Sequence, residues 1–204
     1  MERRLVVDQR VALRQEARRR EVMEVAIAVF SERGYRAASM NDIAANMGMG
    51  KASLYHYVTS KEEVLIELYE DVLRENVIAA RRIASSQRTA LDALAELLAD
   101  RVAYTCRNRD LLRIFFEEEA ELPARQQSRL ISVRHEYEQT LLDMVARGEA
   151  AGEFSLPTTP QIFVNTVLGA ANWVYKWYQP QGPLSPEELG SQIAGILLAG
   201  LRSP

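Results

Sequence analysis

The sequence predicts an all-α fold, and three observations support that prediction. Apolar residues recur at three- and four-residue spacing through nearly the whole chain, as in the segment 64–73, which is the period of a helix with one buried face. No apolar–polar alternation is bounded by turn signals as a strand would be. A serine followed three residues later by an acidic residue, at Ser39, Ser60 and Ser185, is typical of helix starts.

The periodic segments divide the chain into nine expected helices. Gly34 and Gly48 stop the first two, and Thr159-Pro160 and Ser185-Pro186 place a cap residue before proline at the start of the last two. The last two are joined by the short loop QPQGPLS, so they should pack antiparallel. Residues 1–15 are expected to be a mobile arm, and the helices are expected at 16–33, 39–48, 51–57, 61–84, 89–107, 109–120, 124–150, 161–178 and 186–201.

Composition fits a protein that folds in water around its own core. Of 204 residues, 48% are apolar and 26% are charged, as in ordinary globular domains. Cys106 is the one cysteine, which excludes an intrachain disulfide and suits a small buried residue. No apolar run is long enough to span a membrane and the N-terminus lacks the apolar core of a signal peptide, so a cytoplasmic protein is expected.

Charge is distributed unevenly along the chain. Residues 1–60 carry ten Lys or Arg and seven acidic residues, a net charge of +3, whereas the whole chain carries −3. A basic N-terminal segment on an acidic body fits a protein that contacts phosphate at one end only.

The segment 39–57 has the properties of a helix-turn-helix. Two short helices must meet at a steep angle across a turn of three or four residues, and Gly48 supplies the positive φ that such a turn needs. Ala44 is small enough to let the second helix approach, and Gly50 can cap it. The segment therefore predicts a DNA-binding unit, with a generic helical hairpin as the alternative.

The second helix of this unit would present its exposed residues to DNA. Lys51 and Ser53 can reach phosphate or base edges near the helix start, and Ala52 can meet a thymine methyl group. Tyr55 and His56 are candidates for base or phosphate contact. Tyr57, and Lys61 just beyond it, are better placed for backbone phosphate.

These residues also carry a resemblance to a known family. The stretch 22–65 resembles the N-terminal domain of the TetR/AcrR family of repressors, in a match of several parts at fixed spacing. Two positions depart from the usual pattern: Gly50 stands where the family often has serine, and Val58 where it usually has phenylalanine. The matching pieces are AIAVFSERGY (26–35), ASMNDIA (38–44), Gly48, KASLYHY (51–57) and SKE (60–62).

The resemblance implies a nine-helix, TetR-like homodimer with two DNA-reading heads. Residues 1–60 would form the arm and the helix-turn-helix domain, and 61–204 the ligand-binding and dimerisation domain. The operator would be palindromic, with half-sites about one helical turn apart, roughly 34–36 Å. Arg18, Arg19 and Arg20 are expected to contact phosphate or the minor groove, the alternative being a solvated charge run, and Ser39 joins the expected DNA contacts.

The last two expected helices, 161–178 and 186–201, are apolar over more than one face and rich in small residues. A dimer made from these helices and their two-fold mates is the natural interpretation. Simple core helices are the alternative.

Two C-terminal segments carry a second resemblance, GAANWVYKWYQPQGPLSPEEL (169–189) and DLLRIFFEEEAELPARQQSRLISVRHEYEQTLLDMVARGEAAGEF (110–154). They resemble a TetR subgroup whose effectors are acyl-CoA thioesters, which includes regulators of fatty-acid, phenylacetate and steroid catabolism. An acyl-CoA needs an apolar tunnel and cations for its phosphates, while core packing and solvated faces are the plainer explanations of the same side chains. The expected ligand-binding residues are Tyr104, Leu112, Arg113, Phe115, Phe116, Arg134, Tyr137, Leu141, Asn172, Trp173, Lys176 and Trp177.

Other function classes find less support. No Ser/His/Asp arrangement, glycine-rich phosphate loop or zinc spacing occurs, so neither an enzyme nor a cofactor or metal site is expected. A structural or adaptor protein that kept the helical bundle but lost DNA binding is a further alternative, but Lys51, Tyr55 and Tyr57 are intact. The sequence therefore predicts a repressor released from its operator by an acyl-CoA, with a repressor of an efflux or stress gene that responds to a lipophilic, drug-like ligand as the alternative.

Overall fold

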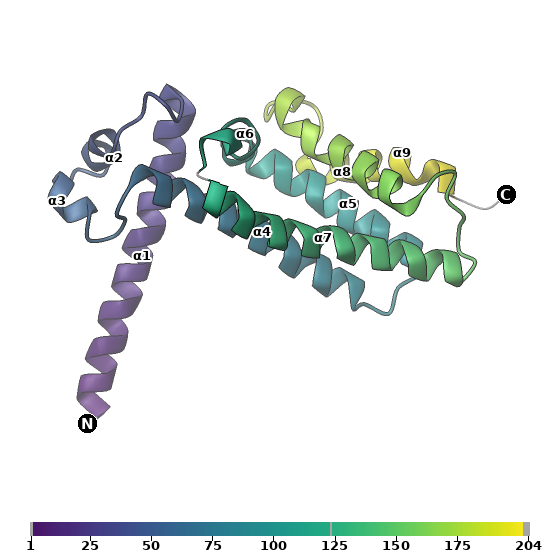
Figure 1. The fold of residues 1–204 in the computed structure, drawn as a ribbon, viewed down its shortest axis with the longest axis horizontal. Coiled ribbons are helices and arrows are strands. Elements are labelled where there is room, and N and C mark those ends of the chain that lie inside the picture. Colours follow the sequence, from purple (N-terminus) through teal and green to yellow (C-terminus); the bar gives the residue numbers. More distant parts are fainter. Residues whose placement is uncertain (1, 123, 202–204) are drawn as a thin grey trace. The chain divides into compact units, whose positions relative to one another are not determined.

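A computed structural model describes residues 2–122 and 124–201 (Figure 1). Every regular element in these residues is helical, as the sequence predicts. The elements are α1 (Glu2–Arg33), α2 (Met40–Asn46), α3 (Lys51–Leu54), α4 (Lys61–Ala84), α5 (Ala90–Arg107), α6 (Arg109–Glu117), the 3₁₀ helix η1 (Glu119–Glu121), α7 (Ala124–Ala150), α8 (Pro160–Trp177), α9 (Pro186–Leu198) and the 3₁₀ helix η2 (Ala199–Leu201).

Two helices differ from the expected bounds. The helix α1 begins at Glu2, where the sequence predicts a mobile arm, because the first fifteen residues hold neither glycine nor proline to interrupt it. The helix α3 ends at Leu54 rather than near Tyr57. The chain tightens after it, since the backbone N–H of His56 donates to the carbonyl of Ser53, three residues earlier, at 3.3 Å.

The chain forms two compact units, which are described separately. The first, called the head, comprises Met1–Tyr69 and Ile114–Pro123, and the second, called the body, comprises Glu70–Arg113 and Ala124–Pro204. The head thus extends past the expected boundary at residue 60. Inside it, the Tyr69 hydroxyl donates to the carbonyl of Ile114 at 3.1 Å, which fixes the start of the returning segment.

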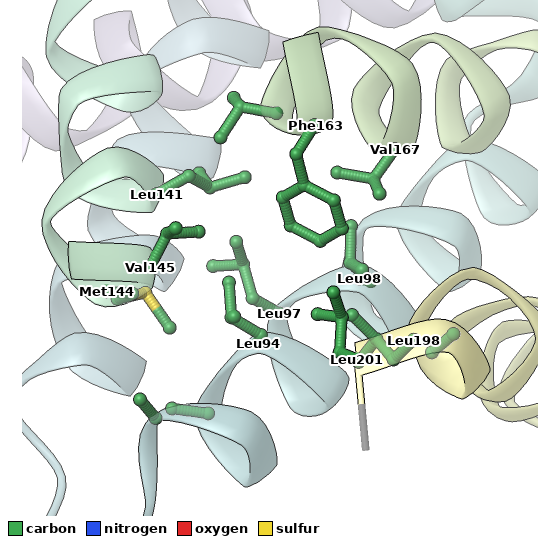
Figure 2. Close-up of a cluster of buried hydrophobic side chains, with 14 of the residues drawn as sticks. Leu94, Leu97, Leu98, Leu141, Met144, Val145, Phe163, Val167, Leu198 and Leu201 are labelled. Carbon is green, nitrogen blue, oxygen red and sulfur yellow. The ribbon is translucent and has the colours of Figure 1, made fainter. Parts of the chain in front are cut away.

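The body is a bundle built around α5. This helix packs against α7, α8 and α9, and the four helices direct apolar side chains toward one another (Figure 2). Among the described residues no helix is long and apolar enough to cross a membrane. The core between these helices includes Leu94, Leu97, Leu98, Leu141, Met144, Val145, Phe163, Val167, Leu198 and Leu201.

The helices α5 and α9 cross in close contact at Gly190. A Cβ atom placed on Gly190 would lie 2.4 Å from the carbonyl oxygen of Ala99, well inside van der Waals contact. Glycine at this position therefore sets the separation of the two helices. Cys106 is buried on the same bundle, and burial raises the pKa of its thiol to about 11, so the thiol stays protonated at neutral pH.

Candidate DNA-binding head and effector site

The turn between α2 and α3 has the local structure of a helix-turn-helix. Ser39 and Asp42 form the expected capping box, in which the Asp42 N–H donates to the Ser39 hydroxyl and the Ser39 N–H donates to the Asp42 carboxylate at 2.9 Å. Hydrogen bonds to the Asp42 carboxylate from the Ser39 hydroxyl, at 2.6 Å, and from the Ser39 N–H lower the pKa of Asp42. Gly48 has φ +63°, as the turn requires, and Gly50 caps α3 with extended backbone and no side-chain bond.

The helix α3 buries one residue and exposes the others. Leu54 is fully buried and anchors the helix on the head, together with buried Ile43 of α2 and Val58. The candidates for base and phosphate contact remain accessible on the opposite side. Lys51, Ala52, Ser53, Tyr55 and His56 are exposed, and Tyr57 is half-buried.

Arg19 is held within the head. Its guanidinium makes a bidentate contact with Glu67, with Nε at 2.8 Å from one carboxylate oxygen, and Nη1 donates to the carbonyl of Tyr57 at 2.6 Å. A further contact reaches Glu63 at 3.3 Å. Hydrogen bonds to Glu67, outweighing the opposing effect of burial, raise the pKa of Arg19. The Arg19 side chain thus joins α1 to α4 and to the backbone at Tyr57, just after α3. The sequence predicts a phosphate contact for Arg19 instead.

Lys61 has a similar internal role. Its ammonium donates to the carbonyls of Tyr35 at 2.8 Å and Ala38 at 2.9 Å, and lies 3.3 Å from that of Arg36. It also sits 4.4 Å from the centroid of the Tyr35 ring. A lysine has three N–H donors, and here they hold the loop between α1 and α2. The expected phosphate contact by Lys61 would require this loop to be released.

The remaining expected contacts of the head stay candidates. Arg20 is exposed, and half-buried Arg18 pairs with Glu21 one turn further along the same helix. Exposed ion pairs of this kind contribute little to stability and exchange readily, so Arg18 can still meet a phosphate. Ser39 is exposed, although its hydroxyl is engaged in the capping box.

The expected ligand-binding residues do not all lie together. Phe115 belongs to the head, where it stacks on Tyr69 with ring centroids 4.4 Å apart, and Phe116 packs edge-on against it. Leu112 and Leu141 in the body are fully buried. Arg113 has its Nη2 atom 3.9 Å from the Oδ1 atom of Asp110. Arg134 is half-buried on α7.

The aromatic residues near the end of α8 face outward. Trp173 and Trp177 are 59% and 50% exposed, and the exposed Lys176 ammonium lies 5.9 Å from the Trp173 ring centroid. They therefore do not line the interior of the body, where the sequence predicts a tunnel. Exposed Ile162 of α8 and Ile196 of α9 add to the apolar surface that these two helices present.

Three expected ligand residues do meet inside the body, around one residue that sequence reasoning missed. Arg101 of α5 is buried, and its Nε donates to the side-chain oxygen of Asn172 on α8 at 2.9 Å. The Tyr104 ring centroid lies 5.9 Å from the Arg101 guanidinium carbon. Burial lowers the pKa of Arg101 and raises that of Tyr137 on α7, and each affects the other electrostatically. These four residues are called the polar cluster.

Comparisons with known proteins agree with this architecture. Residues 22–68 match the model of bacterial regulatory proteins of the tetR family, and residues 87–201 match the tetracyclin repressor-like C-terminal domain. The chain belongs to the TetR family. Members of this family are DNA-binding transcriptional regulators and not enzymes.

This TetR-family regulator is similar along nearly its whole length to individual members. The HTH-type transcriptional repressor KstR2 of Mycobacterium tuberculosis is 31% identical over 194 residues, 94% of this chain and 96% of the relative. A solved structure described as the ketosteroid transcriptional regulator KstR2 of the same species has a TM-score of 0.84 at 28% identity, covering 92% of this chain and 96% of that one. AibR, crystallised with isovaleryl coenzyme A and operator DNA, has a TM-score of 0.78 at 26% identity, covering 90% of this chain and all of that one.

A groove on the body of this TetR-family regulator was also not predicted. It lies between α4 and α7 and has a volume of about 290 Å³, near the lower end for small-molecule sites. Its walls combine apolar and charged side chains. This site is hard to recognise from either helix alone, because both have the pattern of ordinary amphipathic helices. The lining residues are Glu70, Arg74, Val77, Ile78, Arg81, Leu130, Val133 and Glu136.

Proposed function

We propose that this protein represses transcription by binding a palindromic operator as a homodimer, and that an acyl-CoA thioester releases it. The observation that best supports DNA binding is the exposed face of α3, which follows the glycine turn at Gly48. Lys51, Ala52 and Ser53 are presented near a helix start, the part of a recognition helix that meets base edges in the major groove. The similarity to a relative named as a repressor favours repression over activation.

The effector class is inferred from the body and from a structural neighbour. AibR was crystallised with isovaleryl coenzyme A, so a body of this fold can accept a CoA thioester. The groove between α4 and α7 offers apolar Val77 and Leu130 beside Arg74 and Arg81. We propose that it receives part of such a molecule, because apolar walls suit an acyl chain and arginines suit phosphate.

The homodimer is proposed to form through the outward surface of α8 and α9. This apolar face is defined by Ile162, Trp173, Trp177 and Ile196, each at least half exposed in a single chain. Large apolar side chains gathered on one surface mark interaction sites, and a two-fold axis lets the same surface serve both partners. A dimer would place two α3 helices on successive major grooves.

The energetic demand on the effector is moderate. Moving the dimer from a DNA-competent to a DNA-released population, from 99:1 to 1:99, needs a differential affinity of about 5.5 kcal/mol. Burial of an acyl chain contributes about 0.8 kcal/mol for each CH₂ group, so about seven CH₂ groups buried only in the DNA-released state would supply this difference.

The deciding experiment begins by selecting an operator from a random duplex library with the purified protein. The selected duplex is then titrated with the protein in the presence of acyl-CoAs of several chain lengths, free fatty acids, free CoA and cationic dyes. Release by thioesters alone supports the proposal. Release by dyes or free acids would replace the acyl-CoA effector with a drug-like or fatty-acid one, and failure to select any duplex would remove the DNA-binding function itself.

A further inference from the structure

Arg101 of the body has a buried N–H group, on Nη1, that finds no acceptor among the described residues. The residue is 6% exposed, and its Nη1 atom is fully buried with no hydrogen-bond partner among the described residues. Its Nε is satisfied by Asn172 at 2.9 Å. The guanidinium is thus held in place through Nε, while Nη1 makes no hydrogen bond to any described residue.

Such an arrangement is costly in a resting protein. A buried donor left unpaired carries its full desolvation penalty, which is larger for a charged group than for a neutral one. More than nine in ten buried polar groups in folded proteins are paired. An unpaired buried donor of this kind calls for a partner that is not part of the chain, such as a water molecule, an ion or a ligand.

The residues around Arg101 are more accessible to solvent than Arg101 itself. Tyr104, Tyr137 and Asn172 are each partly accessible, although Arg101 between them is not. Tyr137 also packs against the apolar core of the bundle, and it follows the groove residues Val133 and Glu136 on α7. Tyr137 therefore connects the polar cluster with the apolar core of the bundle.

We propose that Arg101 binds the effector by donating a hydrogen bond from Nη1 to an oxygen atom of its acyl part. The inference rests on the proposed function and adds a chemical requirement to it. The acceptor is the thioester carbonyl or an oxygen further along the acyl group, a ketone or a carboxylate, since each presents a lone pair to a guanidinium. Asn172 is then a positioning residue that orients Arg101.

The experiment measures binding of matched probes to the full-length protein by calorimetry. Decanoyl-CoA is compared with the S-decyl-CoA thioether, which lacks only the carbonyl oxygen, and with the mono-CoA thioester of decanedioic acid, which carries a carboxylate at the far end. The variant Arg101→Met removes the donor. Arg107→Met is the matched control, because Arg107 is an exposed arginine on the same helix paired with Glu187.

A probe that supplies the oxygen should bind the wild-type protein about 10- to 100-fold more tightly than its counterpart without it, the usual range for a hydrogen bond to a charged group. A preference for decanoyl-CoA over the thioether identifies the thioester carbonyl as the acceptor. A preference for the decanedioic acid thioester over decanoyl-CoA identifies the oxygen at the far end of the acyl group. Arg101→Met should abolish the preference while operator binding persists, and Arg107→Met should keep it. The melting temperature of Arg101→Met without ligand should be unchanged or higher, since replacing an unpaired buried charge by an apolar chain removes a penalty.

Equal binding of all probes by wild type and Arg101→Met would overturn the inference and leave the acyl-CoA effector intact. A lower melting temperature for Arg101→Met with an unchanged probe preference would also overturn it, because Arg101 would then be structural. Failure of every thioester to bind the wild-type protein would instead overturn the proposed effector class.

Discussion

Basic residues near the recognition segment divide into two groups by their surroundings. Arg19 and Lys61 are satisfied by groups of the head itself, a carboxylate and backbone carbonyls respectively. Lys51 is exposed at the start of α3, with the Tyr55 ring 5.8 Å away. We therefore expect Lys51 and Lys61 to affect DNA binding differently, and the salt dependence of binding measures that difference.

The variants Lys51→Gln and Lys61→Gln form a matched pair for this purpose. The slope of log K against log[salt] becomes shallower by about 0.9 for each phosphate that the protein no longer neutralises. We expect that change for Lys51→Gln, with an unchanged unfolding midpoint. For Lys61→Gln we expect the wild-type salt slope and a lower unfolding midpoint, because three carbonyls would be deprived of their donor. A shallower slope for Lys61→Gln and a wild-type slope for Lys51→Gln would mean that Lys61, and not Lys51, contacts a phosphate.

Acid should weaken the head through Glu63. Burial alone would raise its pKa, but hydrogen bonds from Thr59 and contact with Arg19 outweigh burial and lower it. A lowered folded-state pKa means that the stabilising contribution is complete above the unfolded value, about 4.3, and is lost as pH falls through the folded value. The urea midpoint of Glu63→Gln should lie below that of wild type at pH 7, and the gap should narrow as the pH falls below the unfolded pKa of about 4.3. A gap independent of pH would show that the carboxylate charge is not the cause.

At the scale of the elements, capping chemistry is what the sequence predicts best. The boxes at Ser39 and Ser185 form as expected. At Ser60 only half of the box forms: the hydroxyl accepts from the Glu63 N–H at 3.1 Å, but the Glu63 carboxylate accepts from Thr59 one residue earlier. Caps are predictable because they involve atoms three residues apart, whereas the choice between neighbouring donors depends on Arg19, which is distant in sequence.

The effector region was less predictable because it depends on which face of each helix is buried. Arg101 follows Leu94, Leu97 and Leu98 at helical spacing, so it occupies a buried stripe position, and that signal could have found it. Trp173 and Trp177 share a face by their own spacing, but periodicity does not say whether that face looks inward or outward. The structure turns them outward.

Gly190 gives a prediction for the crossing of α5 and α9. Gly190→Ala would force its methyl group against the Ala99 carbonyl, which is backbone and cannot move alone. Overpacking of this kind costs about 1–3 kcal/mol, more than the gain from alanine's higher helix propensity. Denaturant unfolding should show this destabilisation, while Ser191→Ala, an exposed neighbour on α9, should not. Equal stability of both variants would mean that the helices can separate freely.

For the whole molecule, the proposed dimer through the apolar face of α8 and α9 would link assembly to DNA binding. Ile196 is 74% exposed in one chain, and around a two-fold axis a glutamate there would face an apolar partner surface without a cation to pair with, a costly burial. Ile196→Glu should therefore give folded monomers by sedimentation, with helix content retained. Operator affinity should fall sharply as well, since each half-site would be bound by one head alone.

The matched control is Ile131→Glu on α7, a residue 60% exposed that lies outside the α8 and α9 face. It introduces the same charge and should leave both the dimer and operator affinity unchanged. If Ile131→Glu rather than Ile196→Glu dissociated the dimer, the interface would involve α7 instead of α8 and α9. The distance between the two α3 helices would then differ from the one proposed. In the proposed dimer, the face that forms the interface would decide which motions of the body change the distance between the two heads.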